Sequence, residues 1–112
     1  MKARIPGAPQ GGQANMMKKI QEMQENMEKV QQEVEASEFS STTGGGAVEV
    51  TVNGAHEILS VVIKPEVVDP EDIEMLQDMI ISAANESIRK ANEAMEKGME
   101  QAKGGLSIPG LI

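Results

Sequence analysis

The residues in this chain that could do chemistry are not spaced to form an active site. Carboxylates are plentiful, with 18 Asp and Glu, but their spacing suits solvated helix faces. The single histidine, His56, lies in a predicted turn and is expected to be solvated. There is no cysteine, so thiol chemistry and disulfides are excluded. No Glu-x-x-His pair is present for a carboxylate-bridged metal centre, and the serines have no histidine close in sequence. We therefore expect no enzyme activity, no catalytic residues, no metal, no cofactor and no small-molecule substrate.

The glycine triplet Gly44–Gly46 is the next candidate, because glycine-rich loops can bind phosphate. Such a loop would lead into a helix and carry a Lys-Ser/Thr pair. Here the glycines lead into the alternating segment 47–52, which is typical of a strand. The triplet is therefore predicted to form a turn.

Positive charge is the remaining candidate for a binding function. The chain has 10 basic and 18 acidic side chains and a net charge of −8. Residues 1–19 hold four basic side chains and no acid, whereas the rest of the chain carries −12. This segment is either the basic end of an ordinary soluble helix or a positive arm on an acidic body. The candidate phosphate contacts are Lys2, Arg4, Lys18 and Lys19, with Arg89 and Lys90 as a second pair whose more probable role is as surface charges.

Composition excludes other classes of protein. Phe39 is the only aromatic residue, so the chain cannot build a platform for stacking single-stranded bases. No apolar run approaches the roughly 20 residues of a membrane span, and residues 1–19 lack the apolar core of a secretory signal. We expect a cytoplasmic protein that does not enter membranes.

The first predicted helix, about 15–36 with Asn15 as its N-cap, carries a narrow apolar stripe with steps of four and three residues. This seam consists of Met16, Ile20, Met23, Met27, Val30 and Val34. It needs a partner helix, so it is expected to form a core or dimer seam. The alternative is a methionine-rich groove that receives helices of other proteins.

Three strands are predicted to follow, over 37–43, 47–52 and 58–63. Val48, Val50 and Val52 alternate with polar residues, and Asn53-Gly54 indicates a hairpin. Leu59, Val61 and Ile63 are expected to join the same core. The result is an antiparallel meander with one apolar face.

A second long helix is predicted from the Asp69-Pro70 pair to about Lys103, ended by Gly104-Gly105. At roughly 50 Å it exceeds the ~20 Å of a short strand, so its second half needs another partner. We expect a flexible basic arm over 1–13, one domain over 14–105 and an apolar tail over 106–112. The tail is expected to dock on the body or on a second subunit.

The order of these elements resembles the YbaB/EbfC family of bacterial nucleoid-associated proteins. Three passages carry the resemblance: MMKKIQEMQENMEKVQQEV in the first helix, the segment from GGGAVEVTVNG to NESIRKA, and the ending GGLSIPGLI. Each is weak alone, but their order and spacing are specific.

The resemblance implies an α+β protomer, with a long helix, a three-stranded antiparallel meander and a long helix, that forms a tweezer-like homodimer. It also implies binding of duplex DNA with low sequence specificity, a place in the cytoplasmic nucleoid and an influence on gene expression. Lys18 and Lys19 match the family's basic helix start, and Lys2 and Arg4 lie on the adjoining arm. The acidic composition leaves an alternative, a coiled-coil-like scaffold for protein partners with no DNA role.

Overall fold

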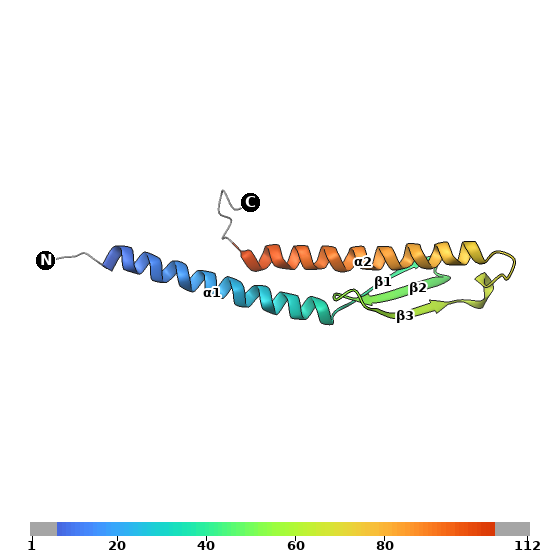
Figure 1. The fold of residues 1–112 in the computed structure, drawn as a ribbon, viewed down its shortest axis with the longest axis horizontal. Helices are drawn as coiled ribbons and strands as arrows, with labels where there is room; N and C mark the ends of the chain where they lie inside the picture. Colours follow the sequence, from blue (N-terminus) through green and yellow to red (C-terminus); the bar gives the residue numbers. More distant parts are fainter. Residues whose placement is uncertain (1–6, 105–112) are drawn as a thin grey trace.

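The computed structural model describes residues 7–104 of the chain, with side chains from residue 14 onward. The expected α+β architecture is confirmed: two long helices flank a three-stranded antiparallel sheet (Figure 1). The elements are α1 (Gly7–Ala36), β1 (Glu38–Thr43), β2 (Val48–Asn53), β3 (Ile58–Ile63), the 3-10 helix η1 (Pro65–Val67) and α2 (Ile73–Lys103). The molecule is elongated, with extents of 88 × 24 × 16 Å, because the sheet lies at one end and the helices run toward the other.

The glycine triplet forms the predicted turn between β1 and β2. Gly44, Gly45 and Gly46 have φ angles of 62°, 67° and 92°. Three consecutive residues in this left-handed region would strain any L side chain, so the turn requires glycine. β1 and β2 then pair in register from Thr43 opposite Val48 to Glu38 opposite Asn53.

The Asn-Gly pair does mark the second hairpin, but the residue with positive φ is His56, at 68°. Asn53 N donates to Glu57 O at 3.0 Å, which closes a three-residue loop, and a bulge follows between Thr51 and Val52. Gly54 is needed for another reason. A Cβ on Gly54 would stand 2.0 Å from the carbonyl oxygen of Val34, at the end of α1.

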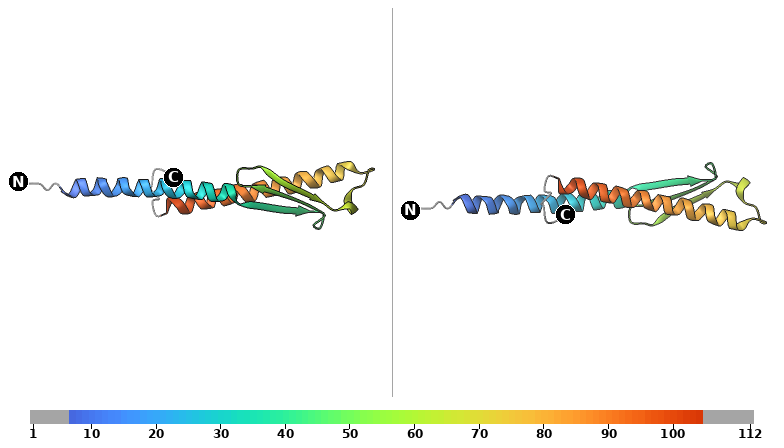
Figure 2. Two further views of the ribbon diagram at one scale, coloured as in Figure 1. Left: turned by 90° about the horizontal axis from the view of Figure 1, so that it is seen from below. Right: turned by 90° about the horizontal axis from the view of Figure 1, so that it is seen from above.

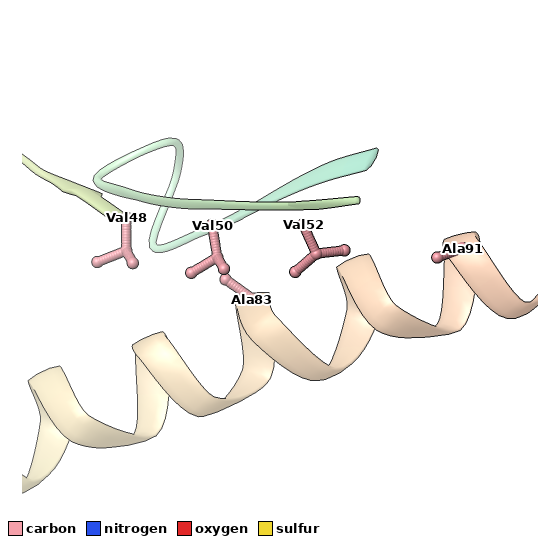
Figure 3. Packing of buried hydrophobic residues seen from close by; sticks show 5 residues of the cluster. All are labelled: Val48, Val50, Val52, Ala83 and Ala91. Carbon is pink, nitrogen blue, oxygen red and sulfur yellow. The ribbon is translucent and has the colours of Figure 1, made fainter. Parts of the chain in front are cut away.

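The core lies between β2 and α2 (Figure 3). Val48, Val50 and Val52 are fully buried, as predicted, and point at α2, where Ala83 is also fully buried. The small side chains of α2 let the helix approach the sheet closely. Within this core the Ser87 hydroxyl donates to Val50 O at 2.7 Å, which satisfies a polar group that burial would otherwise penalise.

β3 is not covered as expected within one chain. Only Ile63 packs on the core, while α2 contacts β1 and β2. One helix about 10 Å wide can cover two strands spaced about 4.8 Å apart, but not three. An edge strand with apolar residues on both faces is therefore left open; we call its exposed residues, Ile58, Leu59, Val61 and Val62, the β3 surface.

Both helices begin at positions different from those predicted. α1 starts at Gly7 rather than near Asn15. Pro9 is compatible with this start, because the N–H groups of a first turn have no partner within the helix. Residues 7–13 of the expected arm are thus helical, and residues 1–6 lie outside the described residues. α2 begins after Asp72, whose side chain accepts from Met75 N at 3.2 Å.

Asp69 and Pro70, the predicted helix start, instead form a turn before α2. The Asp69 carboxylate accepts from Glu71 N, and its carbonyl accepts from Asp72 N, both at 2.9 Å. Asp69 and Asp72 are equally suited to cap a helix, and the sequence alone did not distinguish them. The predicted end is confirmed, because α2 stops at Lys103 and Gly104 caps it with φ 57°.

Candidate nucleic-acid interface

The two helices run antiparallel and lie side by side beyond the sheet (Figure 2). α2 ends alongside the middle of α1, so the first turns of α1 project past it (Figure 1). At this point an open hollow of about 310 Å³ separates the two helices. It is lined from α1 by Lys19, Glu22, Met23 and Asn26 and from α2 by Ala102, Lys103 and Gly104.

Three exposed lysines lie at or next to this hollow. Lys18 and Lys19 come from α1, and Lys103 comes from the last turn of α2. Among the side chains that the structure describes, none of the three has a salt-bridge partner. We call Lys18, Lys19 and Lys103 the distal lysines. An ammonium group free of acidic partners is available to neutralise a phosphate.

Lys103 was missed in the sequence, where it served only to mark the end of the helix. A lysine in a last turn commonly complements the negative end of the helix dipole, so its position in the sequence gave no reason to group it with Lys19. Its place beside Lys19 depends on how far α2 runs back along α1. The predicted helix lengths, combined with antiparallel pairing of the two helices, could have suggested that Lys103 lies beside Lys19.

Arg89 is placed differently from the distal lysines, because its charge is used within α2. Its guanidinium group forms ion pairs with Glu86 and Glu93, three and four residues away on the same helix. The hydrogen bond to Glu86 raises the pKa of Arg89, and the hydrogen bond from Arg89 lowers the pKa of Glu86. A cation held between two carboxylates attracts phosphate weakly.

Lys90, the other member of this pair, is engaged with the sheet. Its Nζ donates to the carbonyl oxygen of Ser40 at 2.7 Å and so ties α2 to β1. The structure thus places Arg89 and Lys90 over the sheet and not with Lys18 and Lys19. Lys2 and Arg4 lie outside the described residues.

The predicted α1 seam is divided by the end of α2. Met23, Met27, Val30 and Val34 are half-buried, and α1 and α2 pack against each other over this stretch. Met16 and Ile20 continue the stripe but are 52% and 41% exposed. Most of the seam is therefore a contact within one chain, which leaves little of it open as a groove for foreign helices.

The remaining candidates for chemistry give no second site. His56 is exposed, and its Nε2 lies 2.6 Å from Asn92 Oδ1, so it joins the hairpin to α2. Within residues 7–104, no group of three or more histidine, cysteine, aspartate and glutamate side chains is placed to hold a metal ion. None of the helices described carries an apolar stretch long enough to cross a lipid bilayer.

Comparison with known proteins agrees with this geometry. The model of the YbaB/EbfC DNA-binding family matches residues 10–106. A nucleoid-associated protein of Clostridium acetobutylicum is 51% identical over 110 residues, covering 98% of both chains. One from Alkaliphilus metalliredigens is 52% identical over 106 residues, covering 95% of this chain and 91% of its own.

A solved structure shows the same fold in a more distant protein. The crystal structure of an uncharacterized protein from Helicobacter pylori matches with a TM-score of 0.58 at 24% identity. The match covers 70% of this chain and 90% of that one. At this identity the likeness concerns the fold alone. The family model and the bacterial relatives carry the assignment: this chain belongs to the YbaB/EbfC DNA-binding family.

Proposed function

We propose that this protein is a homodimeric, nucleoid-associated protein that binds duplex DNA with low sequence specificity through its distal lysines. The observation that carries the proposal is that Lys19 of α1 and Lys103 of α2 line one hollow, with Lys18 next to Lys19 in the chain. None of the three has a salt-bridge partner among the described side chains. Membership of a DNA-binding family and the names of the relatives support it.

Low specificity follows from the kind of contact that lysines make. An ammonium group on a flexible stem neutralises phosphates, which fix a protein on DNA but carry no sequence information. The acidic remainder of the chain repels the duplex and would confine contact to the lysine-bearing end. Lys2 and Arg4, on the adjoining segment, would extend the same positive region. Binding of this kind can organise the nucleoid and thereby affect gene expression.

The proposed dimer forms through the β3 surface. Ile58, Leu59, Val61 and Val62 are each 44% exposed or more, on a strand with one unpaired edge. Such an edge is prone to pairing with another chain, and a second copy provides an identical apolar strand. The sheet lies at one end of the molecule, and α2, whose last residue is Lys103, ends away from it (Figure 1). A dimer joined at the sheets would therefore carry two projecting helix pairs.

The test compares variants that remove charge from the distal lysines with a variant that removes charge from Arg89. K18Q/K19Q and K103Q are each expected to weaken binding of a fluorescent duplex by about tenfold or more, measured by anisotropy at fixed low salt. R89Q is the matched control, since its charge is already paired, and is expected to change affinity much less. E22Q, which removes the acid that lines the same hollow, is expected to tighten binding.

Two results would contradict the proposed site. Unchanged affinity of K18Q/K19Q and K103Q would remove the distal lysines from the interface. A loss in R89Q as large as theirs would place DNA over the sheet instead. The mass of each variant, determined by light scattering, separates loss of binding from loss of the dimer.

A further inference from the structure

We infer that the apolar segment 105–112 packs along the exposed end of the α1 seam of its own chain, covering Met16 and Ile20. The inference concerns a contact within the protein and does not rest on DNA binding. It assigns an occupant to a helix face that the described residues leave open.

The first argument is the continuity of the seam. Met16, Ile20 and Met23 belong to one stripe, because steps of four and three residues return to the same face of a helix. From Met23 onward the stripe is half-buried, in the stretch where α1 packs on α2. Ahead of Met23 the cover stops because α2 has ended, although the apolar pattern of α1 continues. The sequence of α1 therefore indicates a partner that α2 does not supply.

The second argument is where the chain goes next. Gly104 ends α2 and lines the hollow together with Met23 and Lys19, so the described part of the chain ends beside the last covered part of the seam. The eight residues that follow read GLSIPGLI. They include four large apolar side chains and no charged one, and Pro109 opposes a continuing helix. A segment of this composition gains from burial on an apolar stripe.

The third argument is length. Eight residues in an extended conformation reach about 26 Å. From Met23 back to Met16 the helix rises only about 10 Å. The segment can thus cover both exposed seam residues without strain. A tether of this kind raises the effective concentration of the segment at its own seam to the millimolar range, which favours its own chain over a second copy.

A disulfide trap tests the contact directly. Because the chain has no cysteine of its own, only the two introduced thiols can form a disulfide. The double variant M16C/I108C is oxidised mildly in the full, folded protein and run on a denaturing gel without reductant. We expect a disulfide within one chain, seen as a fast-migrating monomer. E25C/I108C is the matched control, because residue 25 lies nine positions from Met16 and so about half a turn away on the opposite face.

Three outcomes would overturn the inference. Equal disulfide yields in M16C/I108C and E25C/I108C would show no preference for the seam. A disulfide between chains, seen as a covalent dimer, would assign the segment to a second copy. Hydrogen exchange provides the third: L106S/I108S should speed amide exchange several-fold around Met16 to Met23 and leave β2 unchanged. Exchange that stays the same around Met16 would contradict the packing.

Discussion

Gly98 of α2 lies directly against Val30 of α1. A Cβ placed on Gly98 would stand 2.6 Å from Val30 Cγ1, which is closer than real contacts allow. The missing side chain lets the helices approach each other beyond the edge of the sheet, where no strand supports them. This contact sets how the projecting part of α1 leaves the body of the protein.

Gly98→Ala should therefore destabilise the protein even though alanine is the better helix former. Overpacking costs about 1–3 kcal/mol, against a gain of about 1 kcal/mol in helix propensity, so the free energy of unfolding should fall by about 1 kcal/mol. In a Val30→Ala background the clash is removed and G98A should become stabilising. Urea denaturation of the four proteins at equal concentration measures the coupling; additive effects would contradict the contact.

Gly54→Ala should be far more damaging than a glycine substitution in the other turn. Its Cβ would meet the backbone oxygen of Val34 at 2.0 Å, and a backbone cannot rotate away as a side chain can. We expect a loss of more than about 3 kcal/mol, or failure to fold. Gly45→Ala is the control, since nothing lies within 4 Å of it and its φ of 67° costs only about 1–2 kcal/mol. Similar losses in thermal denaturation would disprove the close approach.

Val61→Lys should break the proposed dimer without unfolding the protomer, because Val61 is 44% exposed in one chain. A lysine at this place on the β3 surface would have to be desolvated against an apolar partner. Light scattering across a dilution series should show the dimer shifting to monomer. Thr42→Lys, on the exposed opposite edge strand β1, should leave the mass unchanged. An intact V61K dimer would place the subunit contact elsewhere.

The pairing of Arg89 with Glu86 predicts a pH dependence. The pKa of Glu86 is lowered from its ordinary value of 4.5, first by the hydrogen bond from Arg89. A group whose pKa falls on folding adds stability above its ordinary pKa and loses it as the pH drops through the folded value. Arg89→Gln should move the pKa of Glu86 back toward 4.5 in a carboxyl NMR titration. The difference in unfolding free energy between R89Q and the parent protein should vanish in acid. A difference that persists in acid would show that the ion pair with Glu86 is not its cause.

The sequence predicted the parts of the fold that depend on local pattern. The alternation of apolar and polar residues predicted that Val48 and Val50 are buried, and the glycine triplet predicted the turn between β1 and β2. It did not predict how many strands α2 can cover, because that depends on the width of a helix against the spacing of strands. For the same reason the sequence predicted Leu59 and Val61 in the core, whereas the core of one chain does not reach them.

The residues of the candidate site likewise fall into those that the sequence predicted and those that it did not. Lys18 and Lys19 were identified by charge and by resemblance to the family. Lys103 was missed because its neighbour Lys19 is more than 80 residues away in sequence and is brought near only by the antiparallel helices. Arg89 is a residue type that commonly contacts phosphate, but Glu86, three residues before it, and Glu93, four residues after it, pair with its charge.

The salt dependence of DNA binding tests the central claim most directly. Anisotropy of a duplex of about 30 base pairs, roughly 100 Å long, would be titrated with the protein from about 0.05 to 0.2 M salt. Each neutralised phosphate contributes a slope of about −0.9, so six distal lysines in a dimer account for about −5. We predict a slope at least that steep, which K18Q/K19Q/K103Q flattens by about that amount. Absence of binding at the lowest salt, or an unaltered slope in the triple variant, would contradict the account.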